Sequence, residues 1–98
     1  MSIRRNCAAS NGRLGKSNGA SLVLADLTGA YLSKAKLPTA NLAYAYFVAA
    51  DLTEADLSAS NLQGARLDGA CLAGVSLEGA NLAYSSLRGA NLRGANLR

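Results

Sequence analysis

The sequence predicts an all-β solenoid in which short strands and corners wind around a core of leucine side chains. Two observations carry this prediction. An apolar residue stands at every fifth position from residue 22 to residue 97, and glycine recurs in one fixed register with those apolar residues. Chains with a fixed internal period fold by stacking one structural unit on the next. The repeat therefore indicates the fold class before any single residue is considered.

The repeating unit has five residues, and its apolar residue is called the central residue below. All sixteen central positions hold Leu except one, which holds Phe47. Two residues before each central residue stands a small one, which is Ala in thirteen of the sixteen units and otherwise Ser60, Val75 or Ser85. Because no unit departs from the pattern, residues 20–98 form one uninterrupted repeat domain.

A period of five excludes the two commonest secondary structures. Five residues advance an α-helix by about 500°, so successive central residues would point in all directions. A plain strand alternates its faces with period two, and five is odd. A short strand followed by a corner fits the pattern. The small and central residues point inward, the outward residue between them faces solvent, and two corner residues follow.

Corner residues support the same register. Seven glycines occupy the second corner position, where a type II turn requires a positive φ. Pro38 occupies the first corner position, which suits its fixed φ. Corners earlier in the chain hold residues such as Lys34, Glu54 and Ala59 instead of glycine. The corners from Gly64 to Gly79 all hold glycine, so we expect regular type II corners there and more irregular corners earlier.

Units such as Ala25-Asp26-Leu27-Thr28-Gly29 and Ala90-Asn91-Leu92-Arg93-Gly94 resemble the A(D/N)LXX repeat of the pentapeptide-repeat family. The resemblance covers about four-fifths of the chain, and the composition is similar to that of small cyanobacterial members. It implies a right-handed quadrilateral β-helix with four units in each coil, hence about four coils. In such a stack Phe47 would lie between Leu27 and Leu67.

Residues 1–19 break the register and form a separate, non-repeat N-terminal segment. The segment is polar and basic, and it is either a frayed tail, which we favour, or a loose cap over the first coil. The sequence shows no secretory signal and no apolar run long enough to span a membrane. We expect a cytoplasmic protein in which Cys7 and Cys71 are both free thiols.

Stacking units twenty residues apart sorts the outer surface into four faces. One of them carries no charged residue and presents Val23, Leu24, Tyr44 and Tyr84. Interfaces are enriched in aromatic residues and depleted of charges, so this face is a candidate lateral contact. The alternative is a neutral surface with a few exposed tyrosines. Three asparagines stacked on the same face, Asn41, Asn61 and Asn81, predict a structural ladder in which amides bond neighbouring coils.

No catalytic, cofactor or metal site is predicted. The chain has no His, which removes the commonest general base and metal ligand. Asp51, Glu54 and Asp56 lie close in sequence, but a solid leucine core leaves no pocket beside them. We therefore expect no enzymatic activity, no cofactor and no small-molecule substrate.

The charged residues are banded along the chain. The net charge is +4, yet residues 41–60 hold three acidic residues and no basic one. Arg88, Arg93 and Arg98 share one repeat position on three successive faces, so they would ring the C-terminal coil. They are candidates for contact with an acidic partner, and the alternative is that they only aid solubility. The absence of interleaved aromatic residues argues against nucleic acid as the partner.

These observations favour a non-catalytic protein-interaction module that binds a protein partner or itself. An uncapped final coil further predicts that another repeat chain stacks on it. The resemblance suggests one alternative, because some members of the family mimic B-form DNA and bind DNA gyrase. Such mimicry requires an acidic rod, and the net positive charge of this chain argues against it.

Overall fold

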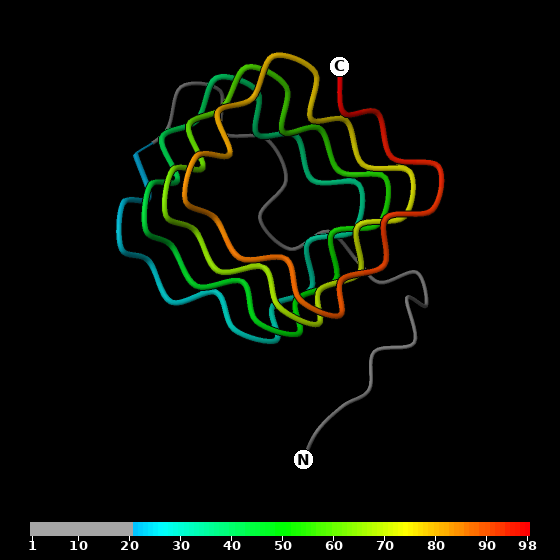
Figure 1. Ribbon diagram of the computed structural model, residues 1–98, viewed down its shortest axis with the longest axis horizontal. Coiled ribbons are helices and arrows are strands. Elements are labelled where there is room, and N and C mark those ends of the chain that lie inside the picture. Colours follow the sequence, from blue (N-terminus) through cyan, green and yellow to red (C-terminus); the bar gives the residue numbers. More distant parts are fainter. Residues whose placement is uncertain (1–20) are drawn as a thin grey trace.

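A computed structural model describes residues 21–98 of the chain, which wind around a common axis in stacked turns (Figure 1). Within these residues there is no helix and no strand longer than one residue. Isolated parallel bridges join outward residues twenty apart, from Ser21 with Asn41 to Ser76 with Asn96. One turn of the solenoid therefore takes twenty residues, which is four repeat units. No helix in this part of the chain is long and apolar enough to cross a membrane.

Three backbone hydrogen bonds per unit hold neighbouring turns together. The central residue donates to the next turn, as Leu42 N–H does to the Asn61 carbonyl at 2.7 Å. The second corner residue does the same, as Tyr44 N–H does to the Gln63 carbonyl at 2.8 Å. The outward residue donates to the previous turn, as Asn61 N–H does to the Ala40 carbonyl at 2.9 Å. Each unit is thus paired on both sides along the axis.

Every corner in residues 21–98 is a regular turn, and the expectation of irregular early corners is wrong. All fifteen second corner residues have a positive φ, between 57° and 73°, and eight of them are not glycine. The small residue that follows each corner donates its N–H to the carbonyl of the preceding central residue and so closes the turn, as Ala45 N–H does to the Leu42 carbonyl at 3.1 Å. Stacking explains the uniformity, because a corner of different shape would misplace the N–H that bonds the next turn. The hydrogen bonds between turns thus offset the cost of about 1–2 kcal/mol that a left-handed backbone conformation has at each non-glycine corner.

In eight of the sixteen units the remaining N–H, that of the first corner residue, is capped by the side chain of the unit's own outward residue. The expected asparagine ladder between coils is therefore wrong in its bonding, although the structural role is confirmed. Oδ1 of Asn41, Asn61 and Asn81 each accepts the N–H two residues further along the same turn, at 3.3, 3.0 and 2.9 Å. This arrangement is an Asx turn. It accounts for the Asp and Asn residues that recur at the outward position.

Central and small residues fill the core as the period predicts. Phe47, Leu52, Leu72 and Val75 are fully buried, so the inward assignment is confirmed. Burial of a leucine side chain contributes roughly 1.5–3 kcal/mol, and the leucine column is the main source of stability. Ser60 replaces one small alanine, and its hydroxyl is satisfied because it donates to the Leu37 carbonyl at 2.7 Å.

Candidate interaction surfaces

The predicted uncharged face is present and exposed. We call it the first face, and it consists of residues 21–24, 41–44, 61–64 and 81–84. Val23, Leu24, Tyr44 and Tyr84 are 41%, 65%, 50% and 89% exposed. Leu24, Tyr44 and Tyr84 hold the same corner position of different turns, so they form one column parallel to the axis. The structure thus places the four candidate residues on one face, in three different turns.

Gly64 lies in the same column, between the two tyrosines, and its lack of a side chain makes room for Tyr44. A Cβ atom at Gly64 would lie 2.4 Å from Cδ1 and from Cε1 of the Tyr44 ring. The ring therefore lies along the axis over the corner of the following turn. Tyr84 has no such cover and is the most exposed large apolar side chain of residues 21–98.

The second face, residues 26–29, 46–49, 66–69 and 86–89, carries contacts that were not predicted from the sequence. The Arg66 guanidinium lies 5.8 Å from the centre of the Tyr46 ring, one turn away. Asp68 accepts one hydrogen bond from the Ser86 hydroxyl and a second from Arg88 N–H, the latter at 2.9 Å. Asp68 thereby provides the cap that Ser86 does not supply. The twenty-residue spacing of Tyr46 with Arg66 and of Asp68 with Arg88 was the available signal.

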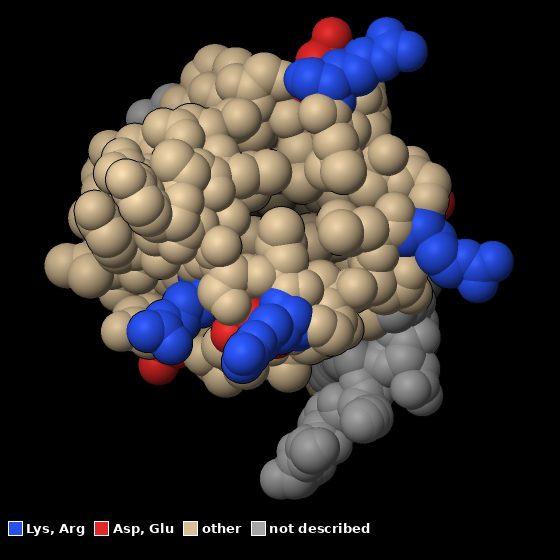
Figure 2. Space-filling view, viewed as in Figure 1, with Lys and Arg blue, Asp and Glu red and all other residues tan. Residues whose placement is uncertain are grey.

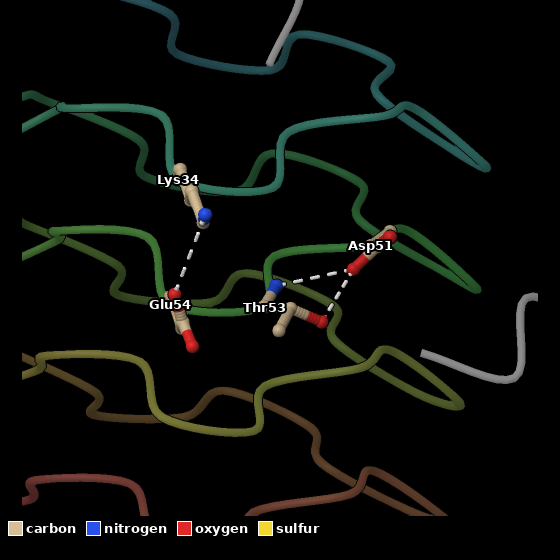
Figure 3. A network of polar contacts seen from close by, with 4 residues as sticks. All are labelled: Lys34, Asp51, Thr53 and Glu54. Atoms are coloured by element: carbon tan, nitrogen blue, oxygen red, sulfur yellow. Dashed lines mark hydrogen bonds and ion pairs between the residues drawn. The ribbon is translucent and has the colours of Figure 1, made fainter. Parts of the chain in front are cut away.

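The third face, residues 31–34, 51–54, 71–74 and 91–94, includes two of the three clustered acidic residues. Asp51 accepts Thr53 N–H at 3.1 Å and the Thr53 hydroxyl at 2.6 Å (Figure 3). Lys34 points along the axis toward Glu54, with Nζ and Oε1 4.0 Å apart (Figure 3). Both partners of this ion pair are well exposed, so it adds little to stability. The Asp51 carboxylate thus caps its own corner, and the Glu54 carboxylate forms a surface ion pair.

Asp56 belongs to the fourth face, residues 36–39, 56–59, 76–79 and 96–98, and likewise caps its own corner. It accepts the N–H and the hydroxyl of Ser58, at 3.0 and 2.7 Å. Residues 21–98 contain no group of three or more acidic, His or Cys side chains placed to hold a metal ion. The acidic cluster seen in the sequence is therefore divided between two faces in the fold.

Three aspartates have their pKa values lowered by hydrogen bonds that favour the carboxylate. The side chain of Thr28 and then its N–H lower the pKa of Asp26. The Ser58 hydroxyl and N–H lower the pKa of Asp56, against a smaller opposing effect of burial. For Asp68 the Ser86 hydroxyl is the largest cause of the lowered pKa. The shifts of Asp26 and Asp56 come from Asx turns at their own corners, whereas that of Asp68 comes from bonds to the following turn.

Cys71 is the outward residue of the third turn on the third face, and it departs from expectation twice. It is buried, with 6% of its surface exposed, and it is disulfide-bonded. The expectation that both thiols are free is therefore wrong for Cys71. Cys7, the other cysteine of the chain, lies outside the described residues, as do residues 1–19 and the predicted tail or cap.

Arg88, Arg93 and Arg98 lie at the first corner position of the last turn and are exposed. Asn91 and Asn96 cap Arg93 N–H and Arg98 N–H, each at 3.1 Å. Basic side chains are spread around the rim of the solenoid and do not gather in one patch (Figure 2). An arrangement of this kind offers separate contact points and no continuous track for a polyanion.

Comparison with known proteins agrees with this geometry. The model of the family described as "Pentapeptide repeats" matches eight copies, over residues 20–58 and 60–98. The chain belongs to the pentapeptide-repeat family. Solved members of this family fold as right-handed quadrilateral β-helices, and they are generally structural, non-enzymatic repeat proteins. The family assignment thus accounts for the twenty-residue turn and the four faces.

Solved cyanobacterial structures of this family are similar to the chain. HetL from Nostoc sp. strain PCC 7120, a protein involved in heterocyst differentiation regulation, is 37% identical over 83% of this chain, with a TM-score of 0.75. The protein alr5209 from Nostoc PCC 7120 is 37% identical over 81% of the chain, with a TM-score of 0.52. Rfr23 from Cyanothece 51142 is 31% identical over 85%, with a TM-score of 0.51.

The matched region covers only part of each relative, amounting to 38% of HetL, 59% of alr5209 and 60% of Rfr23. No curated protein matches the chain at a significant level.

Proposed function

We propose that this chain is a non-catalytic module that binds a protein partner, or a second copy of itself, along the first face. The observation that carries the proposal is the column of Leu24, Tyr44 and Tyr84 on a face without charged residues. Large apolar side chains on a rigid, neutral surface are what protein interfaces use at their centre. Similarity to HetL, which is involved in regulation, also favours a role through contacts.

A second mode of contact is end-to-end stacking on residues 81–98. Central leucines in the middle of the solenoid are fully buried, whereas Leu82, Leu87 and Leu92 are half-buried and Leu97 is 56% exposed. Stacking of another repeat chain would cover these leucines. The nearby arginines would repel a second copy and favour an acidic partner, so we propose a different chain in that position.

Mimicry of DNA is the less favoured alternative. The basic residues outnumber the acidic ones by four, and the acidic band is confined to residues 51–56. An acidic rod long enough to replace a duplex is therefore missing from residues 21–98. The proposed module is expected to act in the cytoplasm, without a cofactor, a small-molecule substrate, nucleic acid or a membrane.

The test compares two tyrosine substitutions on different faces. Tyr84→Ser removes the most exposed apolar side chain of the first face, and Tyr46→Ser removes an exposed tyrosine of the second face. Partner recovery from a native lysate and sedimentation velocity of the pure protein are measured for both. Tyr84→Ser should weaken the contact by about tenfold or more, as loss of an aromatic anchor does, while Tyr46→Ser should leave it unchanged. Equal effects of both substitutions would overturn the proposal.

A further inference from the structure

Hydrogen bonding between turns gives the solenoid a polarity along its axis. Toward the C-terminal side, each unit donates the N–H groups of its central and second corner residues and accepts through the carbonyl of its small residue. Leu42 N–H and Tyr44 N–H, for example, donate to the following turn, which returns one hydrogen bond, from Asn61 N–H to the Ala40 carbonyl. A C-terminal edge thus offers two donors and one acceptor per unit, and an N-terminal edge offers two acceptors and one donor. The two kinds of edge are complementary to each other and not to themselves.

The turn of residues 81–98 forms one end of the stack, and its C-terminal edge is open (Figure 1). Within residues 21–98 no backbone carbonyl accepts the N–H of seven central or second corner residues of this turn, which are Leu82, Tyr84, Leu87, Gly89, Leu92, Gly94 and Leu97. A row of unpaired backbone groups at a sheet edge is a template for another chain. Because donors outnumber acceptors on this edge, two such edges cannot pair. A matching chain must present its N-terminal edge.

Tyr84 stands on this edge and limits which turn can follow it. It holds the same corner position as Tyr44 and nearly the same φ, 61° against 60°. The Tyr44 ring has room only because Gly64 follows it, since a Cβ atom there would lie 2.4 Å from two ring carbons. The backbone carries both tyrosine side chains in the same way, so a turn that stacks on Tyr84 also requires glycine at that corner.

We propose that the C-terminal edge of residues 81–98 takes the N-terminal edge of a different pentapeptide-repeat chain, which holds glycine at the corner over Tyr84. This inference rests on the end-to-end contact proposed above and specifies its polarity and register. A second copy of this chain does not fit. Leu24 holds the corresponding corner of the first described turn, with a φ of 63°, and its Cβ atom would meet the Tyr84 ring.

The first corner positions of the same turn indicate the charge of the partner. Arg88 follows Asp68 by one turn, and Arg98 follows Glu78 by one turn, so acidic and basic residues alternate along two faces. Asp68 accepts Arg88 N–H at 2.9 Å, which shows that these stacked corner positions are in contact. Acidic residues at the first corners of the incoming turn would continue the alternation and place opposite charge beside each arginine.

A photo-reactive benzoylphenylalanine in place of Leu97 tests the partner and its polarity in a native lysate. Leu97 is 56% exposed at the open end. Mass spectrometry should identify a different pentapeptide-repeat chain, cross-linked through its first repeat turn. A link to the C-terminal turn of any chain, to a second copy of this chain or to a protein without repeats would overturn the proposal, as would the absence of any link. The same group in place of Tyr44 reports the first face, so failure of the end contact is distinguishable from failure of the lateral one.

The glycine requirement is tested on the pure protein, in the full chain extended by one turn. A copy of residues 59–78 joined after Arg98 continues the register and places its copy of Gly64 over Tyr84. Amide exchange of the central leucines of residues 81–98 should slow by about tenfold or more, because their N–H groups gain carbonyl partners.

Two substitutions within the copy separate steric fit from backbone strain. Gly64→Leu places a side chain against the Tyr84 ring, whereas Gly69→Leu places one over Gly89, which has no side chain. Both leucines must adopt the same positive φ, so strain is common to the two variants. We expect Gly64→Leu to abolish the slower exchange and Gly69→Leu to preserve most of it. An equal loss in both variants, or no slowing in the unsubstituted extension, would contradict the proposed edge.

Discussion

The Tyr44 ring lies over the backbone of Gly64, where a Cβ atom would be 2.4 Å from two ring carbons. The two residues are twenty positions apart, and only the stacking of turns brings them together. Gly64 therefore meets two demands, a positive φ of 69° and space for the ring. Gly29 has the same φ of 69° but no heavy atom within 4 Å of its added Cβ. Comparing Gly29 with Gly64 therefore separates the effect of the positive φ from the effect of the Tyr44 ring.

We expect Gly64→Ala to destabilise the protein more than Gly29→Ala. Each alanine would adopt a left-handed backbone conformation, which costs about 1–2 kcal/mol. Ala at position 64 must also displace the Tyr44 ring, which costs roughly 1 kcal/mol more. Urea unfolding measures both. In a Tyr44→Ala background the two glycine substitutions should become equal. Persistence of the difference without the ring would show that Tyr44 is not its cause.

Replacement of non-glycine corners by glycine should stabilise the solenoid. Ala49 and Ala59 have φ values of 60° and 57°, which alanine adopts at a cost and glycine does not. After the entropy loss of glycine is subtracted, Ala49→Gly or Ala59→Gly should each gain about 0.5–1 kcal/mol. Ala73→Gly is the control, because Ala73 holds the first corner position without a positive φ. Thermal unfolding should show a loss of stability there.

Removal of a corner cap should have a moderate cost. Asn61→Ala leaves Gln63 N–H without the side-chain oxygen that accepts it at 3.0 Å. For such a hydrogen bond we expect a loss of about 0.5–1.5 kcal/mol in the free energy of unfolding. Ser76→Ala changes the same repeat position, and within residues 21–98 the Ser76 side chain caps no corner. Similar losses for the two variants would contradict the capping role of the outward residue.

Acid should weaken the fold through the capping aspartates. The pKa of Asp56 is lowered in the folded state, chiefly by the Ser58 hydroxyl. A lowered folded pKa gives stability that is present above the unfolded value of about 3.9 and is lost as the pH falls through the folded value. Ser58→Ala should move the pKa of Asp56 toward its ordinary range in an NMR titration. Ser86→Ala should move the pKa of Asp68 instead, and a shift of Asp56 in that variant would contradict the assignment.

The period of five was sufficient to predict which side chains form the core. Leu52 and Leu72 are inward because each unit repeats one local geometry, and local geometry is what a short repeat encodes. The exposed column of Leu24, Tyr44 and Tyr84 followed from the same register once turns of twenty were assumed. Repeat spacing thus predicted the fold and the uncharged face.

Features that depend on contact between turns could not be predicted in the same way. The corner at Ala59 is regular because the adjoining turns impose its shape, although alanine alone would avoid it. Asn61 bonds within its own turn, and the choice between that bond and a ladder depends on side-chain geometry that spacing does not specify. The burial and the disulfide of Cys71 were not predicted either, because the outward position of a repeat unit indicates exposure and repeat spacing does not pair cysteines.

Amide hydrogen exchange tests the stacking of turns most directly. In the second turn, Asp51 N–H, Leu52 N–H and Glu54 N–H donate to backbone carbonyls of neighbouring turns, whereas Thr53 N–H bonds only the Asp51 side chain at 3.1 Å. Exchange should therefore be slow at Asp51, Leu52 and Glu54 and fast at Thr53, and this pattern should recur every five residues. Uniform protection along residues 41–80, or protection with a helical period, would contradict a chain that turns once every twenty residues.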